Sequence, residues 1–240
     1  MGIFTRTTAD GREMSAYEAR VIERAEIPVG AKEISTSRYN LIMGLTVAYG
    51  LVMNAIMVVT MAEPIRLLLY GIHPIFICLG YIAPALLGAY IANKSDKPII
   101  SFLGYNLIVL PFGIMLCLII PSFSTEIVAR AMALTAFITL FMMGLGTAFP
   151  SFFLSKGRAL VMALIVTLIV EIISVFIFGY EGILFDAIFV LIFSLYIAYD
   201  IARSQVYAHT VDNAVDSAVD IYLDIINLFT RILSLHSKRR

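Results

Sequence analysis

The chain has 240 residues, of which 60% are hydrophobic and 14% are charged, and its 17 basic and 17 acidic side chains give no net charge. A chain this apolar cannot bury its hydrophobic surface as one soluble globule. The sequence contains no basic patch and no glycine-rich phosphate loop, so nucleic acid is not an expected partner. The composition predicts an integral membrane protein that has the lipid bilayer as its main partner.

Residues 1–38 form a polar segment with six basic and six acidic side chains. Ser15 and Glu18 have the spacing of a capping box, which predicts a short helix that ends near Ala25. The segment lacks the apolar core of a signal peptide, so we expect the first spanning helix to direct insertion. We interpret residues 1–38 as a cytoplasmic N-terminal tail.

Seven apolar stretches follow, each close to the roughly 20 residues that a helix needs to cross the hydrocarbon core. They lack the alternating pattern of a membrane β-barrel. The sequence therefore predicts an all-α, polytopic membrane protein, with seven transmembrane helices over residues 39–235 and a basic tail over residues 236–240. The stretches are residues 39–61, 73–92, 99–120, 127–149, 159–179, 182–200 and 219–235.

The distribution of basic residues indicates the orientation. With a cytoplasmic N-terminus, the tail and the loops on its side hold eleven Lys and Arg residues, whereas the opposite loops hold only Arg66 and Arg130. Seven crossings then place Arg231 and the basic tail outside, against the same rule. Six crossings with a re-entrant last segment are the alternative.

Two aspartates occupy positions that are costly for a membrane protein. Asp200 closes the sixth stretch, and Asp224 lies inside the seventh, which also carries Asn227 and Arg231. An ionised side chain at bilayer depth costs from ~2.5 kcal/mol upward, so such residues usually serve a function. We expect this polar last helix at the centre of the bundle, where the other helices shield it from lipid.

The helix rise of about 1.5 Å per residue places Asp200 at the cytoplasmic border and Asp224 ~9 Å above it, so the two can approach. Like charges ~4 Å apart repel by ~4 kcal/mol at an effective dielectric of about 20. One carboxyl should therefore hold a proton near neutral pH. We predict that Asp200 and Asp224 form a pair that titrates as one unit and that can also bind calcium transiently.

Three further acidic residues extend this pattern. Asp220 lies one turn before Asp224 and can join the pair. Glu171 and Asp186 lie ~18 and ~24 Å from the cytoplasmic border by the same rise and are candidate pore-lining groups. A hydrogen bond between helices is the alternative role for Glu171, and an interfacial position is the alternative for Asp186.

The longest link between apolar stretches covers residues 201–218 and is polar and acidic. We expect it to be a loop in which Asp212 and Asp216 are solvated charges. Where this region is helical, these aspartates would continue the stripe of Asp220 and Asp224 at intervals of four residues, and the stripe would attract cations towards the pair.

The residues around the pair resemble a known family. Residues 193–200 read Phe-Ser-Leu-Tyr-Ile-Ala-Tyr-Asp, and residues 222–229 read Tyr-Leu-Asp-Ile-Ile-Asn-Leu-Phe. Together they resemble the signature of the Bax inhibitor-1 family, also called the transmembrane Bax inhibitor motif family. The motif covers only these two segments, and the seven apolar stretches and the polar tail are compatible with the family elsewhere.

This resemblance implies a seven-helix bundle with a central C-terminal helix that acts as a pH-sensitive calcium leak. In that family, the aspartates matching Asp200 and Asp224 form a hydrogen-bonded pair that senses pH and gates the path. Some members place an arginine after helix two, which pairs with the first aspartate in a closed state. This chain has Lys94 and Lys97 there, and Arg203 can substitute only if its loop folds back.

The expected function is thus a calcium leak channel that is not an enzyme and needs no cofactor. Calcium is the expected permeant ion, and protons are the expected regulator. We expect a monomer in a prokaryotic plasma membrane with its N-terminus in the cytoplasm, and an organellar membrane is the alternative.

Two other functions remain open. Gly144, Gly146 and Ala148 permit close helix approach, as in a non-transporting regulator of cell death or stress that binds partner helices. An intramembrane aspartyl protease would also use two aspartates on its sixth and seventh helices. The protease is disfavoured, because residues 221–223 before Asp224 are Ile-Tyr-Leu and not the Gly-x-Gly of such enzymes.

Overall fold

The structure is a computed structural model that describes residues 5–7, 13–15, 24, 25, 27, 30–179 and 182–238. Within these ranges it contains eight α-helices, one 3-10 helix and two short strands. The α-helices are α2 (Thr36–Leu68), α3 (Pro74–Lys94), α4 (Pro98–Ile119), α5 (Thr125–Ala148), α6 (Pro150–Leu154), α7 (Gly157–Phe178), α8 (Ile183–Ser204) and α9 (Val211–Lys238). The 3-10 helix η1 (Ile120–Ser122) directly follows α4.

The two strands belong to the N-terminal segment. β1 (Thr5–Thr7) pairs antiparallel with β2 (Glu13–Ser15), and Thr5 lies opposite Ser15. Ser15 is thus the last residue of β2, and its extended backbone is also the usual conformation of a helix N-cap, so the capping box stays a prediction. Arg24 and Ala25 are helical. The rest of the predicted helix lies outside the described residues.

Among the described residues, six helices are long and apolar enough to cross a membrane: α2, α3, α4 with η1, α5, α7 and α8. This result confirms the predicted helical, polytopic membrane part. α9 is not one of the six, and it carries four aspartates and one arginine between Asp212 and Arg231. Its crossing of the membrane therefore stays a prediction. α6 has only five residues and connects α5 to α7.

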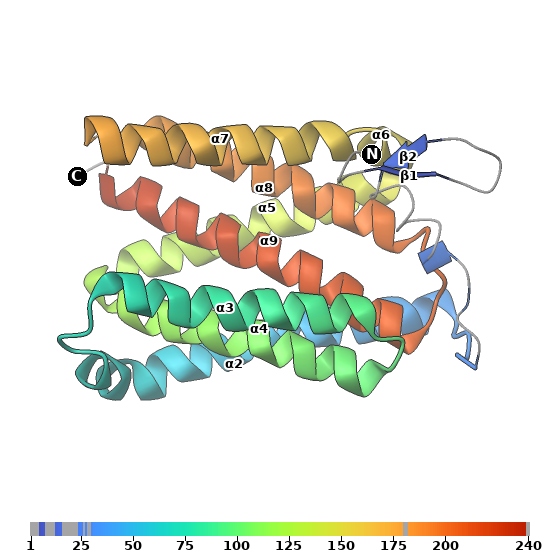
Figure 1. Cartoon of the computed structure of the whole chain (residues 1–240), viewed down its shortest axis with the longest axis horizontal. Helices are drawn as coiled ribbons and strands as arrows, with labels where there is room; N and C mark the ends of the chain where they lie inside the picture. Colours follow the sequence, from blue (N-terminus) through green and yellow to red (C-terminus); the bar gives the residue numbers. More distant parts are fainter. Residues whose placement is uncertain are drawn as a thin grey trace.

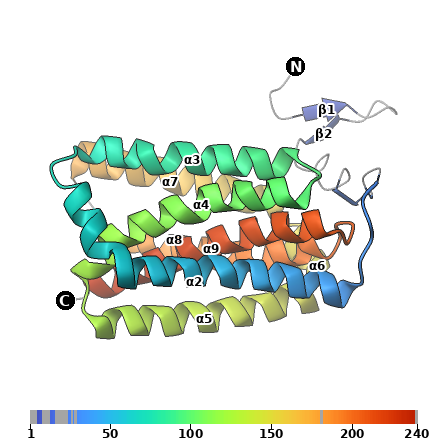
Figure 2. The ribbon, with the colours of Figure 1, turned by 90° about the horizontal axis from the view of Figure 1, so that it is seen from below.

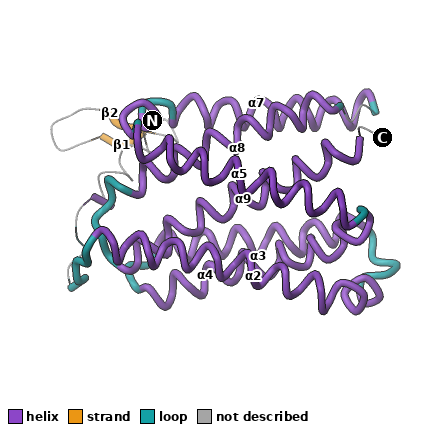
Figure 3. The backbone as a smooth tube through the Cα atoms, turned by 180° about the vertical axis from the view of Figure 1, so that it is seen from behind, coloured by secondary structure: helices purple, strands orange, loops and turns teal. Residues whose placement is uncertain are grey.

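The long helices run back and forth along one axis, and their connections gather at the two ends (Figures 1 and 3). α2, α4, α7 and α9 begin at one end, which also holds the connecting residues 95–97, 155–156 and 205–210. We call this the N-side end. The connections after α2, α4 and α7 lie at the opposite end, where α9 also finishes.

Neighbouring helices cover most of α9. It packs against α2, α4, α5 and α8, and Figure 2 shows it between α2 and α4. None of the residues 211–236 is exposed. A helix with several charges can therefore lie among apolar helices, because its neighbours separate it from the surroundings.

The predicted loop over residues 201–218 is mostly helical, which corrects the sequence interpretation. α8 continues to Ser204, and α9 already begins at Val211. The hydroxyl of Thr210 accepts a hydrogen bond from the Asn213 N–H at 3.1 Å, in the geometry of a helix N-cap. At its other end, α9 runs to Lys238 and so includes part of the predicted basic tail.

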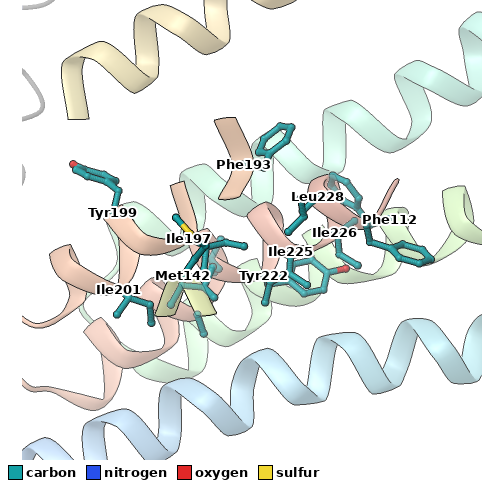
Figure 4. Close-up of a cluster of buried hydrophobic side chains, with 14 of the residues drawn as sticks. Phe112, Met142, Phe193, Ile197, Tyr199, Ile201, Tyr222, Ile225, Ile226 and Leu228 are labelled. Carbon is teal, nitrogen blue, oxygen red and sulfur yellow. The ribbon is translucent and has the colours of Figure 1, made fainter. Parts of the chain in front are cut away.

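The hydrophobic core joins α8, α9 and α5 around the positions of the aspartates. Ile197 of α8, Tyr222 and Ile225 of α9, and Met142 of α5 belong to one buried cluster, part of which is drawn in Figure 4. α5 comes very close to α8 at Gly146, where a Cβ atom would overlap the backbone carbonyl of Ala198. The backbone that carries Asp200 is therefore held by tight packing.

Candidate functional site

Asp200 of α8 and Asp224 of α9 lie side by side in the interior. Their side chains lie close together, and the two residues are only 6% and 7% exposed. Two ionised carboxylates this close would repel each other, so one shared proton would stabilise the pair.

Arg203 supplies the positive charge next to this pair. Its Nη2 atom lies 2.9 Å from Asp200 Oδ1 and 2.5 Å from Asp220 Oδ2. Because α8 continues beyond Asp200, Arg203 reaches that carboxylate from one helical turn away, and no loop has to fold back. Asp220, predicted to join the pair, is linked to it through Arg203.

The two lysines proposed as an alternative latch lie elsewhere. Lys94 is exposed, and its ammonium donates a hydrogen bond to the Tyr90 hydroxyl of the same helix at 3.0 Å. Lys97 is exposed in the turn before α4. Of the three candidate latch residues, Arg203 is the one that contacts the aspartates.

Asp212 and Asp216 are not solvated loop charges, and that prediction is wrong. They are 7% and 4% exposed in the first turns of α9. The Ser101 hydroxyl donates to Asp212 Oδ1 at 2.7 Å, and Arg24 Nη2 lies 2.6 Å from Asp216 Oδ2. Burial raises the pKa of both carboxyls, and these partners oppose that effect. The acidic stripe of α9 consists of Asp212, Asp216, Asp220 and Asp224.

A second charged cluster lies towards the opposite end of the bundle. Arg231 of α9 binds Glu171 of α7 with two hydrogen bonds of 2.5 and 2.9 Å, and it binds Asp186 of α8 at 3.1 Å. The Ser234 hydroxyl also donates to Asp186, and the guanidinium lies 3.9 Å from the centre of the Phe189 ring. The two predicted pore-lining carboxylates therefore meet at one arginine.

The role of Arg231 as a partner was missed at the sequence level, although a signal existed. It is the only basic residue in the apolar stretch 219–235. Two carboxylates inside apolar helices each need a partner, so a lone arginine on a neighbouring helix is a natural choice. A hollow of about 320 Å³ lies beside this cluster and is lined in part by Asp186, Thr230 and Ser234.

Apolar residues separate the two charged clusters. Asp224 and Arg231 are seven positions apart, which corresponds to ~10 Å along a helix. Between them, α9 places Ile225, Ile226 and Leu228 in the buried core (Figure 4). Such a stretch is a barrier to ions, because an ion would lose its hydration there.

The described part of the chain contains no group of three or more His, Cys, Asp or Glu side chains that could hold a metal ion. Asp200 and Asp224 offer carboxylate oxygens, which are the ligand type that calcium prefers, but calcium takes six to eight ligands in a stable site. The arrangement therefore suits brief contact with a passing cation better than a resident metal.

Comparison with known proteins agrees with the motifs around the two aspartates. A family model described as "Inhibitor of apoptosis-promoting Bax1" matches residues 34–240, from just before α2 to the last residue. A search of curated proteins gave no match. The family match covers all the long helices and both charged clusters. The chain belongs to the Bax inhibitor-1 family.

Proposed function

We propose that this protein is a pH-sensitive calcium leak channel, gated by a proton shared between Asp200 and Asp224. The observation that carries the proposal is the buried contact between these two carboxyl groups. A proton-sharing pair is an inherently pH-dependent element, because its charge changes with proton concentration. Its ionised form attracts calcium, and protonation weakens this attraction.

Arg203 acts as the latch in this proposal. By contacting Asp200 and Asp220, its guanidinium occupies carboxylates that a cation would otherwise approach. Protonation of the aspartates weakens their hold on Arg203, since a neutral carboxyl attracts a cation much less than a carboxylate does. Protonation thus releases the arginine but also lowers the attraction for calcium, and the two opposing effects together make the flux depend on pH.

The proposed path follows α9 as the central, seventh crossing of the membrane. It begins at the acidic stripe at the N-side end, passes Asp224, crosses the apolar residues around Leu228 and reaches the cluster around Arg231. We propose that the N-side end faces the cytoplasm and that the protein is a monomer of a prokaryotic plasma membrane. The enclosure of α9 by α2, α4, α5 and α8 supports its place as the central helix of the path.

The substitution Asp224→Asn tests the gate. In proteoliposomes, we expect it to abolish the pH dependence of calcium flux. The asparagine amide can form hydrogen bonds, but its charge does not change with pH in this range. Circular dichroism and size-exclusion chromatography should show a retained fold. Glu63→Gln makes the same chemical change on the exposed surface of α2, away from the acidic stripe, and should leave flux and its pH response as in the wild type.

A pH response that survives Asp224→Asn would refute the pair as the sensor. Mass spectrometry of a cut transmembrane peptide, formed only when both aspartates are present, would instead identify a protease. Of the three small residues considered for a regulator that binds partner helices, Gly146 already packs against Ala198 of the same chain, whereas Gly144 and Ala148 are exposed.

A further inference from the structure

Arg24 of the N-terminal segment is bound at the N-side end of the bundle. Its guanidinium lies 2.6 Å from Asp216 Oδ2 and donates to Asn93 Oδ1 at 3.3 Å. It also lies over the ring of Tyr207 at 5.5 Å from the ring centre. The Arg24 side chain is only 11% exposed, although residues 1–38 were predicted to be a polar tail. Arg24 is therefore part of the packed structure.

Backbone hydrogen bonds hold the same segment in place. The Arg24 carbonyl accepts hydrogen bonds from the Ala208 N–H at 2.8 Å and from the Asn213 side-chain amide at 3.2 Å. Ten residues later, the Ile34 N–H donates to the His209 carbonyl at 2.8 Å. Two points of the N-terminal segment are thus attached to the connection between α8 and α9.

Because Arg24 binds a carboxylate of the acidic stripe, its contact with Asp216 affects how cations approach along the stripe. Asp216 lies one turn from Asp220, which is bonded to Arg203, and two turns from Asp224. Two arginines therefore bind successive carboxylates of the same helix face. A cation that approaches Asp224 along the stripe from the N-side end has to compete first with Arg24 and then with Arg203.

We propose that Arg24 is an inhibitory residue that closes the N-side end of the path by occupying Asp216. The inference rests on the proposed function, because it assumes that cations move along this stripe. Arg24 acts as a tethered cation, and its release exposes a buried carboxylate at the start of the stripe. The N-terminal segment then regulates access separately from the proton-sharing pair.

Hydrogen exchange measures the attachment without any assumption about transport. In the full-length protein, Arg24→Gln should speed amide exchange in residues 205–210, because the amide side chain cannot form an ion pair with Asp216. Asp216→Asn should have the same effect from the other side of the contact. Arg38→Gln is the matched control, because Arg38 is exposed at the start of α2, and it should leave exchange unchanged.

Calcium flux in proteoliposomes tests the inhibition. Arg24→Gln should raise the flux at least about five-fold, the lower end of the usual range for coupling between two sites. Asp216→Asn should not raise it, because it removes the carboxylate that Arg24 exposes on leaving. If the contact had only a structural role, Arg24→Gln and Asp216→Asn would change the calcium flux alike. Arg24→Lys keeps the charge and should restore most of the inhibition.

The two measurements separate the possible failures. Unchanged exchange in Arg24→Gln overturns the attachment itself. Faster exchange with wild-type flux overturns the inhibitory role, and if Asp224→Asn still removes the pH response, the proposed channel function stands. Absence of calcium flux from the wild type and from Arg24→Gln refutes the channel function and the inhibitory role together.

Discussion

Arg203 combines its carboxylate contacts with stacking on aromatic rings, and a lysine cannot reproduce that combination. It binds Asp200 and Asp220 through one nitrogen, and its planar guanidinium lies 5.4 and 5.8 Å from the ring centres of Tyr199 and Tyr207. A lysine ammonium is a compact charge that is more strongly hydrated and has no flat face to stack. The latch proposed for this chain should therefore depend on arginine itself and not only on its charge.

Arg203→Gln should raise calcium flux at neutral pH, because both carboxylates lose their cation. Arg203→Lys should give an intermediate flux, since the charge remains but the stacking is lost. The loss of stability should be smaller than the roughly 3–5 kcal/mol found when one partner of a fully buried ion pair is removed. Asp220 is 32% exposed, so water can replace part of the interaction. Flux assays and thermal unfolding in detergent measure the two effects.

Arg130→Gln serves as the control for this experiment. Arg130 pairs with Glu126 one turn away, and both side chains are more than half exposed, so their ion pair contributes little. Its substitution should change neither flux nor unfolding. If Arg203→Gln behaves like this control in the flux assay, Arg203 is not the latch.

The helices that carry the aspartates are longer than hydropathy predicts, and the reason lies in their polar contacts. The sixth apolar stretch stops at Asp200, but the contact between Asp200 and Arg203 supports one more turn of α8. α9 begins eight residues before the apolar stretch 219–235, because its first aspartates have partners. Ser101 and Arg24 are 111 and 192 positions away from those aspartates, so sequence periodicity cannot reveal them.

The contact between α5 and α8 makes a prediction about packing. Gly146→Ala should lower the free energy of unfolding by ~1–3 kcal/mol, because the added methyl group collides with the Ala198 backbone and the helices must separate. Gly144→Ala is the matched control, since a Cβ atom added at Gly144 would meet no other atom within 4 Å. Thermal unfolding of the two variants in the same detergent provides the comparison. Equal stability of both would contradict a tight contact at Gly146.

At the scale of the whole molecule, the apolar stretches predicted the helical membrane part. They did not predict which charged side chains meet between the helices. The approach of Asp200 to Asp224 was predictable from the helix rise, because both lie near the same end of consecutive helices. The meeting of Glu171 and Asp186 at Arg231 was not, since it depends on the rotation of three helices. Polar contacts of this kind in the interior can be identified only from the three-dimensional structure, whereas the apolar outer surface of the helices can be predicted from the amino-acid composition.

The cluster around Arg231 also bears on the orientation of the chain. The positive-inside rule opposed a seventh crossing, because Arg231 and the basic tail would lie outside. In the structure, however, Arg231 is paired with Glu171 and Asp186. The positive-inside rule concerns basic residues in loops. Because Arg231 is paired in the interior, it indicates the membrane orientation less than the basic residues of the N-side loops do. We therefore expect seven crossings and termini on opposite sides of the membrane.

Cysteine labelling with a membrane-impermeant maleimide tests this topology. Cys78 and Cys117 are first replaced by serine, and single cysteines are then introduced at Ser37, Ser155 or Ser237, which are all exposed. Ser37→Cys and Ser155→Cys lie at the N-side end and should react from the cytoplasmic face. Ser237→Cys lies near the far end of α9 and should react only from the other face. Reaction of Ser237→Cys from the cytoplasmic face would instead require six crossings and a re-entrant α9.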